Sequence, residues 1–238
     1  VIPGYNEMSA GAAKAVIDEV LAPQLVGQDP RHLWQLVGLM DRTIRGNLPC
    51  KAAIEMACVD LSARALGVSA SALFGGPVRD RLPLLWVLAS GDTAIDIAEA
   101  QDKLSQRTHR HFLVKIGAGD PRENIERAIA IRQALPDAAS VRVDVNQGWD
   151  EATARWAIAA LQGGGISVVE QPVSQQDARA MQRLTHSSPL CIMADEAIVT
   201  PQDAIDYASE RKCDAFSIKV SKHGGLLRTS QIAQIAND

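Results

Sequence analysis

The chain has 238 residues, 47% of them hydrophobic, and a formal net charge of −4. A chain of this size and composition can bury a large core, and its charge offers no basic surface for a nucleic-acid partner. No run approaches eighteen apolar residues, so no membrane span is predicted. The four cysteines show neither metal-type spacing nor a disulfide framework, and we interpret them as reduced thiols of a cytoplasmic protein.

The first eighty residues are predicted to be helical. Apolar stripes of helical period predict one helix within each of the stretches 9–27, 29–46 and 50–67. Ser9 is the expected N-cap of the first helix, which is predicted to end before Pro23. The second is predicted to have Asp29 as its cap and Pro30 at its first position, and the third to end at Gly67.

After Leu82 short apolar runs alternate with helical stretches. The predicted strands are "LPLLWVLAS", "HFLVKIG", "SVRVDVN", "ISVVEQP", "LCIMADE" and "AFSIKVSK". The predicted helices between them are "TAIDIAEAQDKLSQR", "PRENIERAIAIRQAL", "DEATARWAIAALQ", "QDARAMQRLT" and "PQDAIDYASER". This order indicates a parallel sheet covered by helices, and the nearly all-apolar strands are typical of strands buried on both faces.

One charged residue stands near the end of each strand from the second to the sixth. These residues are separated by 29, 26, 25 and 24 positions, about one strand and helix each: Lys115, Asp144, Glu170, Asp195 and Lys219. In an α/β barrel the carboxyl ends of the strands converge on one face, where active sites are built. An open sheet would spread the same strands sideways. The pattern therefore favours a barrel.

Three carboxylates, Asp144, Glu170 and Asp195, end consecutive strands and are predicted to lie close together. Bare carboxylates in one place raise one another's pKa, and a divalent cation relieves this repulsion. Oxygen ligands without cysteine or histidine in register favour Mg²⁺ or Mn²⁺ over Zn²⁺. In the alternative interpretation each carboxylate caps the following helix or pairs with a surface arginine.

Lysines flank this group, since Lys115 precedes the carboxylates along the chain and Lys219 follows them. We expect the two amines to face each other across the bound metal. Burial or a neighbouring cation lowers the pKa of a lysine and makes it a usable base near neutral pH. Such a pair suits proton transfer at the carbon beside a metal-bound carboxylate. In the alternative, Lys219 forms a salt bridge with Asp195 or Asp214.

Three further polar residues are weaker candidates for substrate binding or for support of the metal ligands. Asn146 lies two residues beyond Asp144 and is predicted to orient it. Glu196 directly follows Asp195. Lys222, in the stretch "KHGG", either contacts substrate or belongs to a turn that starts the next helix.

At this point the motifs can be compared with a known family. "RVDVNQGWD", "VVEQP", "MADEA" and "SIKVSKHGG", in this order and spacing, resemble the muconate-lactonising branch of the enolase superfamily. "WVLASGD" and "RTHRHF" are similar to its bacterial muconate and chloromuconate cycloisomerases, and the resemblance runs from about Tyr5 to the last residue. It implies a (β/α)7β TIM-like barrel, with its first six strands present, and a partial α+β capping domain. Residues 1–80 would be the helical part of the capping domain and residues 81–238 the partial barrel.

The resemblance also implies a chemistry. Asp144, Glu170 and Asp195 would bind Mn²⁺ or Mg²⁺, Lys115 would donate and accept the proton, and Lys219 would be the opposing lysine, as is known for enolase-superfamily sites with a lysine base. The implied enzyme is an isomerase of the intramolecular lyase type, which converts cis,cis-muconate or a chloromuconate to muconolactone in aromatic catabolism. Its enolate would be stabilised by the metal and protonated by a lysine. The resemblance further implies a cytoplasmic homo-oligomer, often an octamer.

The chain departs from the family pattern at one strand. The family carries Lys-x-Lys there, whereas this chain reads Leu113-Val114-Lys115. Leucine can desolvate Lys115, but it cannot donate a hydrogen bond to a substrate carboxylate. We therefore count Leu113 among the substrate-binding or supporting positions and expect poorer substrate orientation with the base retained.

The family comparison also implies a three-stranded sheet before residue 1 and two more barrel strands after Asp238, so the chain is expected to be truncated at both ends. Two other functions stay open. One is a racemase or dipeptide epimerase on the same scaffold, for which two opposed lysines are also suitable. The other is a truncated or non-catalytic paralogue that assembles with a full-length partner and still binds the metal.

Overall fold

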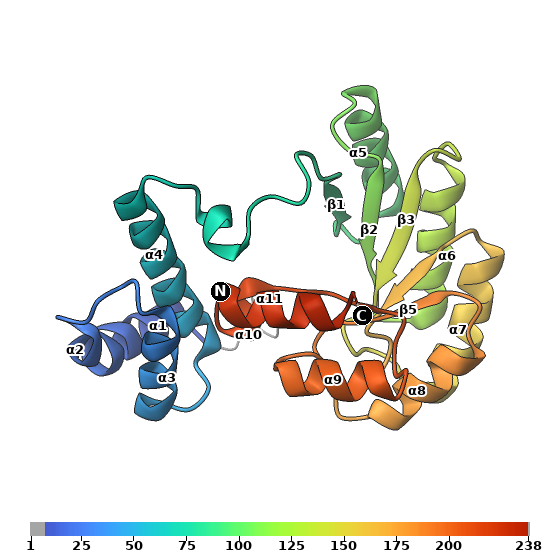
Figure 1. Cartoon of the computed structure of the whole chain (residues 1–238). Coiled ribbons are helices and arrows are strands. Elements are labelled where there is room, and N and C mark those ends of the chain that lie inside the picture. The colour runs from blue at the N-terminus through green and yellow to red at the C-terminus, as the bar shows by residue number, and fades with distance from the viewer. Residues whose placement is uncertain (1–7, 238) are drawn as a thin grey trace. The chain divides into compact units, whose positions relative to one another are not determined.

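The computed structural model describes residues 8–237, and the contacts within the chain divide it into two compact units. One unit combines residues from 1–80 with residues from 218–238, and the other holds residues 81–217 (Figure 1). The predicted domains, 1–80 and 81–238, differ from these units in the placement of the last twenty-one residues. That domain assignment stays a prediction, and its residues 1–7 lie outside the described part of the chain.

The unit of residues 81–217 is built on a sheet of six parallel strands. The strands are β1 (Leu85–Leu88), β2 (His111–Lys115), β3 (Ser140–Asp144), β4 (Val168–Glu170), β5 (Cys191–Ala194) and β6 (Ala215–Phe216). Their order in the sheet is their order in the chain. The predicted parallel α/β arrangement is confirmed, and each strand lies within the apolar run that predicted it. The sixth run is strand over only two residues, and its last three residues, 220–222, are helical, so that part of the prediction is wrong.

One helix follows each of the first five strands, as predicted. The helices are α5 (Thr93–Ser105), α6 (Pro121–Gln133), α7 (Glu151–Gly163), α8 (Ala178–Ser187) and α9 (Pro201–Ser209). Each begins after a residue whose side chain accepts a hydrogen bond from a backbone N–H of the first turn; these caps are Asp92, Asp120, Asp150, Asp177 and Thr200. Such caps satisfy donors that have no partner inside a helix. In Figure 1, α5, α6 and α7 run alongside β1, β2 and β3.

The middle strands are buried and the first strand is partly open. Phe112 and Val114 in β2 and Val143 in β3 are fully buried, as expected for strands covered on both faces. In β1, by contrast, Val87 is 45% exposed. The described sheet has β1 at one edge and β6 at the other, so these two strands have fewer neighbours than the four between them.

Two glycines bring the chain after β2 and the chain after β3 into direct backbone contact. Gly117 has a φ of +113°, and a Cβ built on it would lie 2.0 Å from the carbonyl oxygen of Val145. A Cβ on Gly148 would lie 2.3 Å from the carbonyl oxygen of Gly117. Only glycine allows both the backbone angle and this approach. The close contact fixes the carboxyl ends of β2 and β3 relative to each other, which is where Lys115 and Asp144 stand.

The other unit is helical in the described residues. It contains α1 (Ala10–Ala15), a π-helix η1 (Val16–Leu21), α2 (Ala22–Leu25), α3 (Leu33–Thr43), α4 (Leu48–Leu66), a 3₁₀ helix η2 (Ala70–Phe74), α10 (Val220–His223) and α11 (Leu226–Ile235). Ser9 caps the first of these helices, as predicted. The predicted end before Pro23 is wrong, because the helical chain continues to Leu25. The π-helix restarts the hydrogen-bond pattern, so Pro23 falls in a first turn, where its missing N–H costs little.

The predicted start of the second helix is also wrong. The carboxylate of Asp29 accepts hydrogen bonds from the backbone N–H and the guanidinium of Arg31, at 2.9 and 2.6 Å. This closes a turn, and α3 begins only at Leu33. The third helix ends as predicted at Gly67, which has a left-handed φ of +70°, although it starts two residues earlier than predicted.

A buried carboxylate anchors α11 to α4 within this unit. Glu55 of α4 is 2% exposed, and it accepts hydrogen bonds from the backbone N–H groups of Leu226 and Leu227 at the start of α11. The preceding Gly225 leaves room for that carboxylate, because a Cβ there would lie 1.6 Å from Glu55 Oε2. Burial raises the pKa of Glu55, and the two N–H groups act against that shift.

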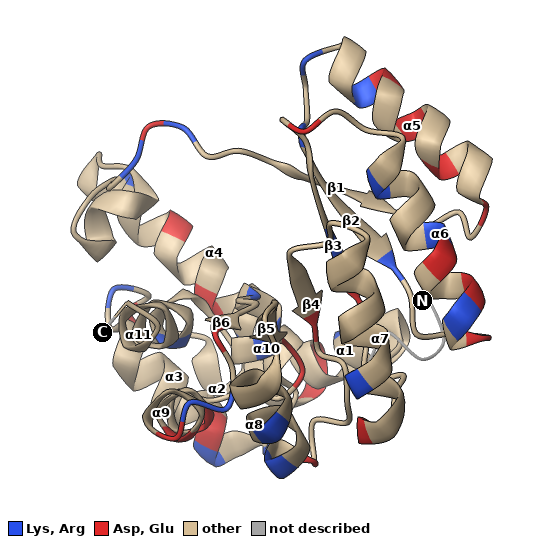
Figure 2. Cartoon of the chain, turned by 90° about the vertical axis from the view of Figure 1, so that its right-hand side faces the viewer, with Lys and Arg blue, Asp and Glu red and all other residues tan. Residues whose placement is uncertain are grey.

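None of the helices in residues 8–237 is both long and apolar enough to cross a membrane. The four cysteines are free, with Cys50 and Cys213 buried and Cys58 and Cys191 partly buried. Lys, Arg, Asp and Glu are interspersed along α5 and α6 (Figure 2), as is typical of helices with one solvent face.

An ion-pair cluster between α7 and α8 predicts acid sensitivity. Glu151 binds Arg155 on its own helix and Arg183 on α8, at 2.6 and 2.5 Å, and these partners lower its pKa to about 2. A carboxyl with a lowered folded pKa adds stability above its unfolded value, near 4.5, and loses it as the pH falls toward 2. We expect Tm to fall less steeply over this range in Glu151→Gln than in the parent. Equal slopes in thermal melts would contradict this assignment.

Candidate metal centre and active site

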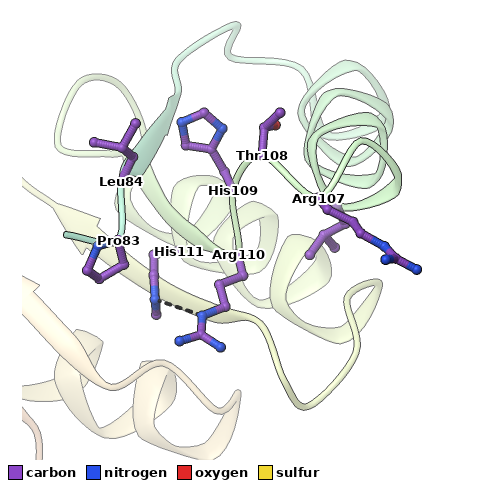
Figure 3. Close-up of a pocket in the computed structure, with 8 residues that line it drawn as sticks. Pro83, Leu84, Arg107, Thr108, His109, Arg110 and His111 are labelled. Atoms are coloured by element: carbon purple, nitrogen blue, oxygen red, sulfur yellow. Dashed lines mark hydrogen bonds between the residues drawn. The ribbon is translucent and has the colours of Figure 1, made fainter. Parts of the chain in front are cut away.

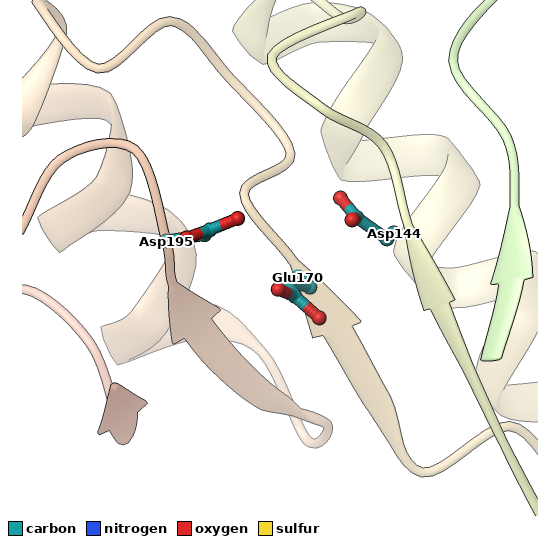
Figure 4. Close-up of side chains that lie close together, drawn as sticks. All are labelled: Asp144, Glu170 and Asp195. Carbon is teal, nitrogen blue, oxygen red and sulfur yellow. The ribbon is translucent and has the colours of Figure 1, made fainter. Parts of the chain in front are cut away.

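Three carboxylates lie together at the carboxyl ends of β3, β4 and β5 (Figure 4). Asp144 and Glu170 are direct partners in the β3–β4 register, and Asp195 follows the last residue of β5. Each offers one oxygen within 4.8 Å of the oxygens of the other two, and each side chain is buried. The parallel register of the strands thus produces the cluster that the even spacing in the sequence predicts.

The electrostatics of the cluster suit a cation. Burial raises the pKa of Glu170, the charges of Asp144 and Asp195 raise it further, and Arg142 and the Ser217 hydroxyl lower it. The Oε2 atom of Glu170 is buried without a hydrogen-bond partner among the described residues. A buried acceptor of this kind is costly unless an ion or a donor meets it. The donor set contains only oxygen atoms, which fits a hard divalent cation.

Helix capping does not account for these carboxylates. The helices that follow them, α7, α8 and α9, are capped by Asp150, Asp177 and Thr200. The arginine pairing in the alternative interpretation is present in one case, since Arg142 Nη2 lies 3.6 Å from Glu170 Oε2. The side chain of Arg142 is partly buried, with 28% of it exposed, so it is not a fully exposed surface arginine.

Lys115, the last residue of β2, points its amine at this cluster. Its Nζ donates to Asp144 Oδ2 at 2.5 Å and to Asn146 Oδ1 at 2.9 Å. The side chain is 24% exposed, whereas that of Asp144 is 1% exposed. The amine is therefore held beside a carboxylate of the cluster, on a side chain that is only partly buried.

Asn146 forms hydrogen bonds with Asp144 and with Glu196. Its backbone N–H donates to Asp144 Oδ1 at 2.9 Å, and its side-chain amide donates to Glu196 Oε1 at 3.2 Å. The contact with Asp144 comes from the backbone because Asn146 has a left-handed φ of +46° and turns the chain after β3. Glu196 lies next to Asp195, and its Oε2 is buried without a hydrogen-bond partner among the described residues.

Leu113 is buried in β2, two residues before Lys115, with 6% of its surface exposed. Its register partner on β3 is Arg142, so the two side chains leave the sheet on the same side. The guanidinium of Arg142 reaches Glu170, and its Nη1 lies 3.9 Å from the sulfur of Met193 on β5. The guanidinium of Arg142 therefore supplies a positive charge on the side of the sheet that carries Leu113, although it is directed at Glu170.

Lys219 and Lys222 belong to the helical unit, which also contains residues from 1–80. Lys219 is the N-cap residue of α10, and its backbone N–H donates to His223 Nε2 at 3.2 Å. Lys222 lies in α10, after which Gly224 and Gly225 lead into α11. The "KHGG" stretch thus ends the short helix α10 and leads into α11, and a contact of Lys222 with substrate stays a prediction. The expectation that Lys219 faces Lys115 stays a prediction.

Two supporting interactions were not found by sequence reasoning. Arg127 of α6 pairs with the fully buried Asp96 of α5 at 2.6 Å, and it also donates to the carbonyl oxygen of Lys115. Gln171, which follows Glu170, donates and accepts hydrogen bonds in the buried space beneath Asp195. The position of Gln171 directly after a ligand candidate is a weak signal, and nothing in the sequence pairs Asp96 with Arg127.

A cleft of about 350 Å³ lies at the other end of β2, before its first residue (Figure 3). Its lining consists of Pro83, Leu84, Leu104, Arg107, Thr108, His109, Arg110 and His111. His111 Nδ1 lies 2.7 Å from the hydroxyl of Ser140. Because this cleft is at the amino end of the strand, the carboxylate cluster does not open into it.

Comparisons with known proteins agree with this geometry. Residues 96–238 match the family model described as "Enolase C-terminal domain-like", and residues 2–75 match "Mandelate racemase / muconate lactonizing enzyme, N-terminal domain". A chloromuconate cycloisomerase of Cupriavidus necator is 45% identical over 234 residues, which are 98% of this chain and 63% of that protein. Muconate cycloisomerase 1 of Pseudomonas putida is 44% identical over 235 residues, which are again 98% of this chain and 63% of that protein.

A solved structure is similar over nearly the whole chain. The muconate lactonizing enzyme of Pseudomonas fluorescens, complexed with muconolactone, is 47% identical with a TM-score of 0.95, and the match covers 98% of this chain and 63% of that one. The chain thus spans about 63% of the length of these relatives. The family model alone accounts for more than half of its residues. The chain therefore belongs to the enolase superfamily.

Proposed function

We propose that the protein to which this chain belongs is a muconate cycloisomerase, acting on cis,cis-muconate or a chloromuconate in aromatic catabolism. The observation that carries the proposal is the buried cluster of Asp144, Glu170 and Asp195 with the amine of Lys115 at its edge. The relatives named as muconate and chloromuconate cycloisomerases support the choice of substrate. They also favour it over the racemase or epimerase alternative.

Asp144, Glu170 and Asp195 would together hold one divalent cation, Mn²⁺ or Mg²⁺. The all-oxygen donor set supports this assignment, and so does Glu170 Oε2, which is buried and accepts no hydrogen bond from the described residues. When bound, the cation supplies positive charge that stabilises the enolate form of a substrate carboxylate. Asn146 and Glu196 would support the ligands, because Asn146 hydrogen-bonds both Asp144 and Glu196.

Lys115 would hold and deliver the proton. In the lactonisation, one substrate carboxylate forms a C–O bond to an alkene carbon, and the electron pair of that double bond moves toward the other carboxylate. Lys115 then protonates the carbon beside that carboxylate and regains a proton from solvent, so the dianionic substrate takes up one proton and becomes a monoanionic lactone. The hydrogen bonds from its amine to Asp144 and Asn146 fix the direction of the amine. Lys219 would be the lysine on the opposite side of the substrate, and Lys222 a substrate contact.

The test is turnover by this chain. We would follow the loss of the ultraviolet absorbance of cis,cis-muconate with added Mn²⁺ and repeat the assay with a chelator. Chelator-sensitive turnover is the expected result. A folded, Mn²⁺-binding chain without turnover would favour a non-catalytic paralogue, and exchange of an α-proton of an amino-acid derivative with solvent deuterium would favour an epimerase.

Leu113→Lys tests substrate orientation. A second amine on the face of β2 that carries Lys115 would donate a hydrogen bond to a substrate carboxylate, which leucine cannot do. We expect KM for muconate to fall several-fold, with a smaller rise in kcat. Leu113→Met is the matched control, because it changes the side chain at this buried position without adding a donor. Unchanged steady-state constants in the lysine variant would remove residue 113 from the substrate site.

We also propose that the protein is a cytoplasmic homo-oligomer. The four free cysteines are consistent with a reducing compartment. Exposed apolar side chains such as Trp34 and Val78, 54% and 97% exposed, offer surface for a subunit contact. Light scattering on the purified protein would give the subunit number.

A further inference from the structure

Gln171 carries a buried side-chain amide next to a residue of the carboxylate cluster. It is fully buried, and it directly follows Glu170 at the end of β4. Its φ is +37°, in the left-handed region that residues other than glycine rarely adopt. A strained backbone at a buried polar residue persists only where the surroundings fix it. Its contacts show what fixes it.

The side chain of Gln171 binds the chain that carries Asp195. Its Oε1 accepts hydrogen bonds from the backbone N–H of Asp195 at 2.8 Å and from that of Ala197 at 3.2 Å. Its Nε2 donates to the carbonyl oxygen of Val173 at 3.0 Å. Since both lone pairs of Oε1 are used and the amide nitrogen has an acceptor, the amide has one orientation.

The backbone of Gln171 makes two further hydrogen bonds, one to β5 and one to the segment after β3. Its N–H donates to the carbonyl oxygen of Met193 on β5 at 2.8 Å, and its carbonyl oxygen accepts from the N–H of Gln147 at 2.9 Å. Gln147 belongs to the chain that follows β3 and Asp144. One residue therefore connects the segments that follow all three carboxylate-bearing strands.

We propose that Gln171 is a positioning residue that holds Asp195 beside Glu170 before a cation binds. Like charges at this distance repel, so without a clamp the segment after β5 would move Asp195 away from Glu170. Gln171 prevents this by binding the backbone of Asp195, and the hydrogen bonds of its Oε1 and Nε2 are all to backbone groups. This inference rests on the proposed metal site. A ligand set that is already in place loses less entropy when the cation arrives, so Gln171 raises the affinity.

The test compares two glutamines whose side chains bind different segments: Gln171 binds the backbone of Asp195, and Gln147 binds that of Gln175. Gln171→Leu keeps the approximate size of the side chain and removes its hydrogen bonds. Gln147→Leu is the matched control, because Gln147 also has a positive φ, of +68°, and its Oε1 also accepts a backbone N–H, that of Gln175 in an exposed loop. Mn²⁺ affinity is measured from the electron paramagnetic resonance signal of the free ion, and folding from circular dichroism and Tm.

We expect Gln171→Leu to weaken Mn²⁺ binding by about 10- to 100-fold, as is usual for residues that orient metal ligands. Gln147→Leu is expected to bind within about threefold of the parent, and the spectrum of the bound ion should change only in Gln171→Leu. A folded Gln171→Leu that binds Mn²⁺ as tightly as the parent overturns the inference and leaves the metal site standing. If the parent chain binds no Mn²⁺, both the inference about Gln171 and the proposed metal site are wrong.

A second measurement needs no variant. In the metal-free parent, the amides of Asp195 and Ala197 are expected to exchange with deuterium slowly, because Gln171 already holds them. The amide of Gln175 is the internal reference, because it also donates to a glutamine Oε1 but lies in an exposed loop, where exchange is faster. If Asp195 and Ala197 exchange as fast as Gln175 without metal and slowly only after Mn²⁺ is added, the cation orders the segment and the inference is wrong.

Discussion

Lys115→Met is expected to lower kcat for muconate by at least about 100-fold, the lower end of the range for loss of a general acid or base. Methionine keeps much of the length of the side chain and removes the amine. Mn²⁺ should bind at least as tightly as in the parent, since the ammonium group that neutralises Asp144 is gone. Loss of turnover together with retained metal binding is the combination that assigns the proton to Lys115.

The control for this variant is Lys103→Met. Lys103 on α5 is as exposed as Lys115, 22% against 24% of the side chain, and it lies over the ring of Trp86. The Lys103→Met variant should keep kcat within about twofold of the parent, because Lys103 does not contact Asp144, Glu170 or Asp195. Retention of kcat in Lys115→Met would mean that another group delivers the proton, and Lys219 would be the first to replace.

Glu170→Gln is expected to weaken Mn²⁺ binding by more than about 100-fold, beyond the range usual for supporting residues, and to raise Tm in the absence of metal. The amide has nearly the same shape but no charge. Glu170 is buried beside Asp144 and Asp195, and the repulsion within this group destabilises the metal-free protein. Removing one charge relieves this repulsion, so affinity and stability should change in opposite directions.

A calorimetric titration with Mn²⁺ and a thermal melt in chelator measure the two effects. Glu126→Gln, the same substitution at an exposed position of α6, controls for the change in net charge and should alter neither quantity. A lower metal-free Tm in Glu170→Gln would show that Glu170 mainly serves a structural pairing with Arg142.

The carboxylate cluster could be predicted because it depends on two regular features of the chain. Strands alternate with helices at nearly even intervals, and parallel pairing brings the ends of successive strands to one edge. The register Asp144 to Glu170 follows from these features alone. Lys115 could be placed for the same reason, and its register partner is Asp144.

The supporting residues could not be predicted because their partners are set by the tertiary structure. Arg127 reaches Asp96 across two neighbouring helices, and Gln171 reaches Asp195 through a turn with an unusual backbone angle. Neither contact has a fixed separation in the sequence. The start of α3 was missed for a local reason, since Asp29 binds Arg31 in a turn where a helix cap was expected.

The order of the strands has a consequence for how this sheet forms. Every described pairing joins strands that are consecutive in the chain, with partners such as Leu85 and His111, or Met193 and Ala215, only 22 to 29 residues apart. Each pairing therefore closes a loop that contains a single helix, and the entropic cost of closure is small and similar at every step. Pairing two parallel strands across a whole helix is slower than closing a hairpin, but no step here spans a much longer loop than the others. The sheet can begin at any neighbouring pair and grow by one strand and one helix at a time.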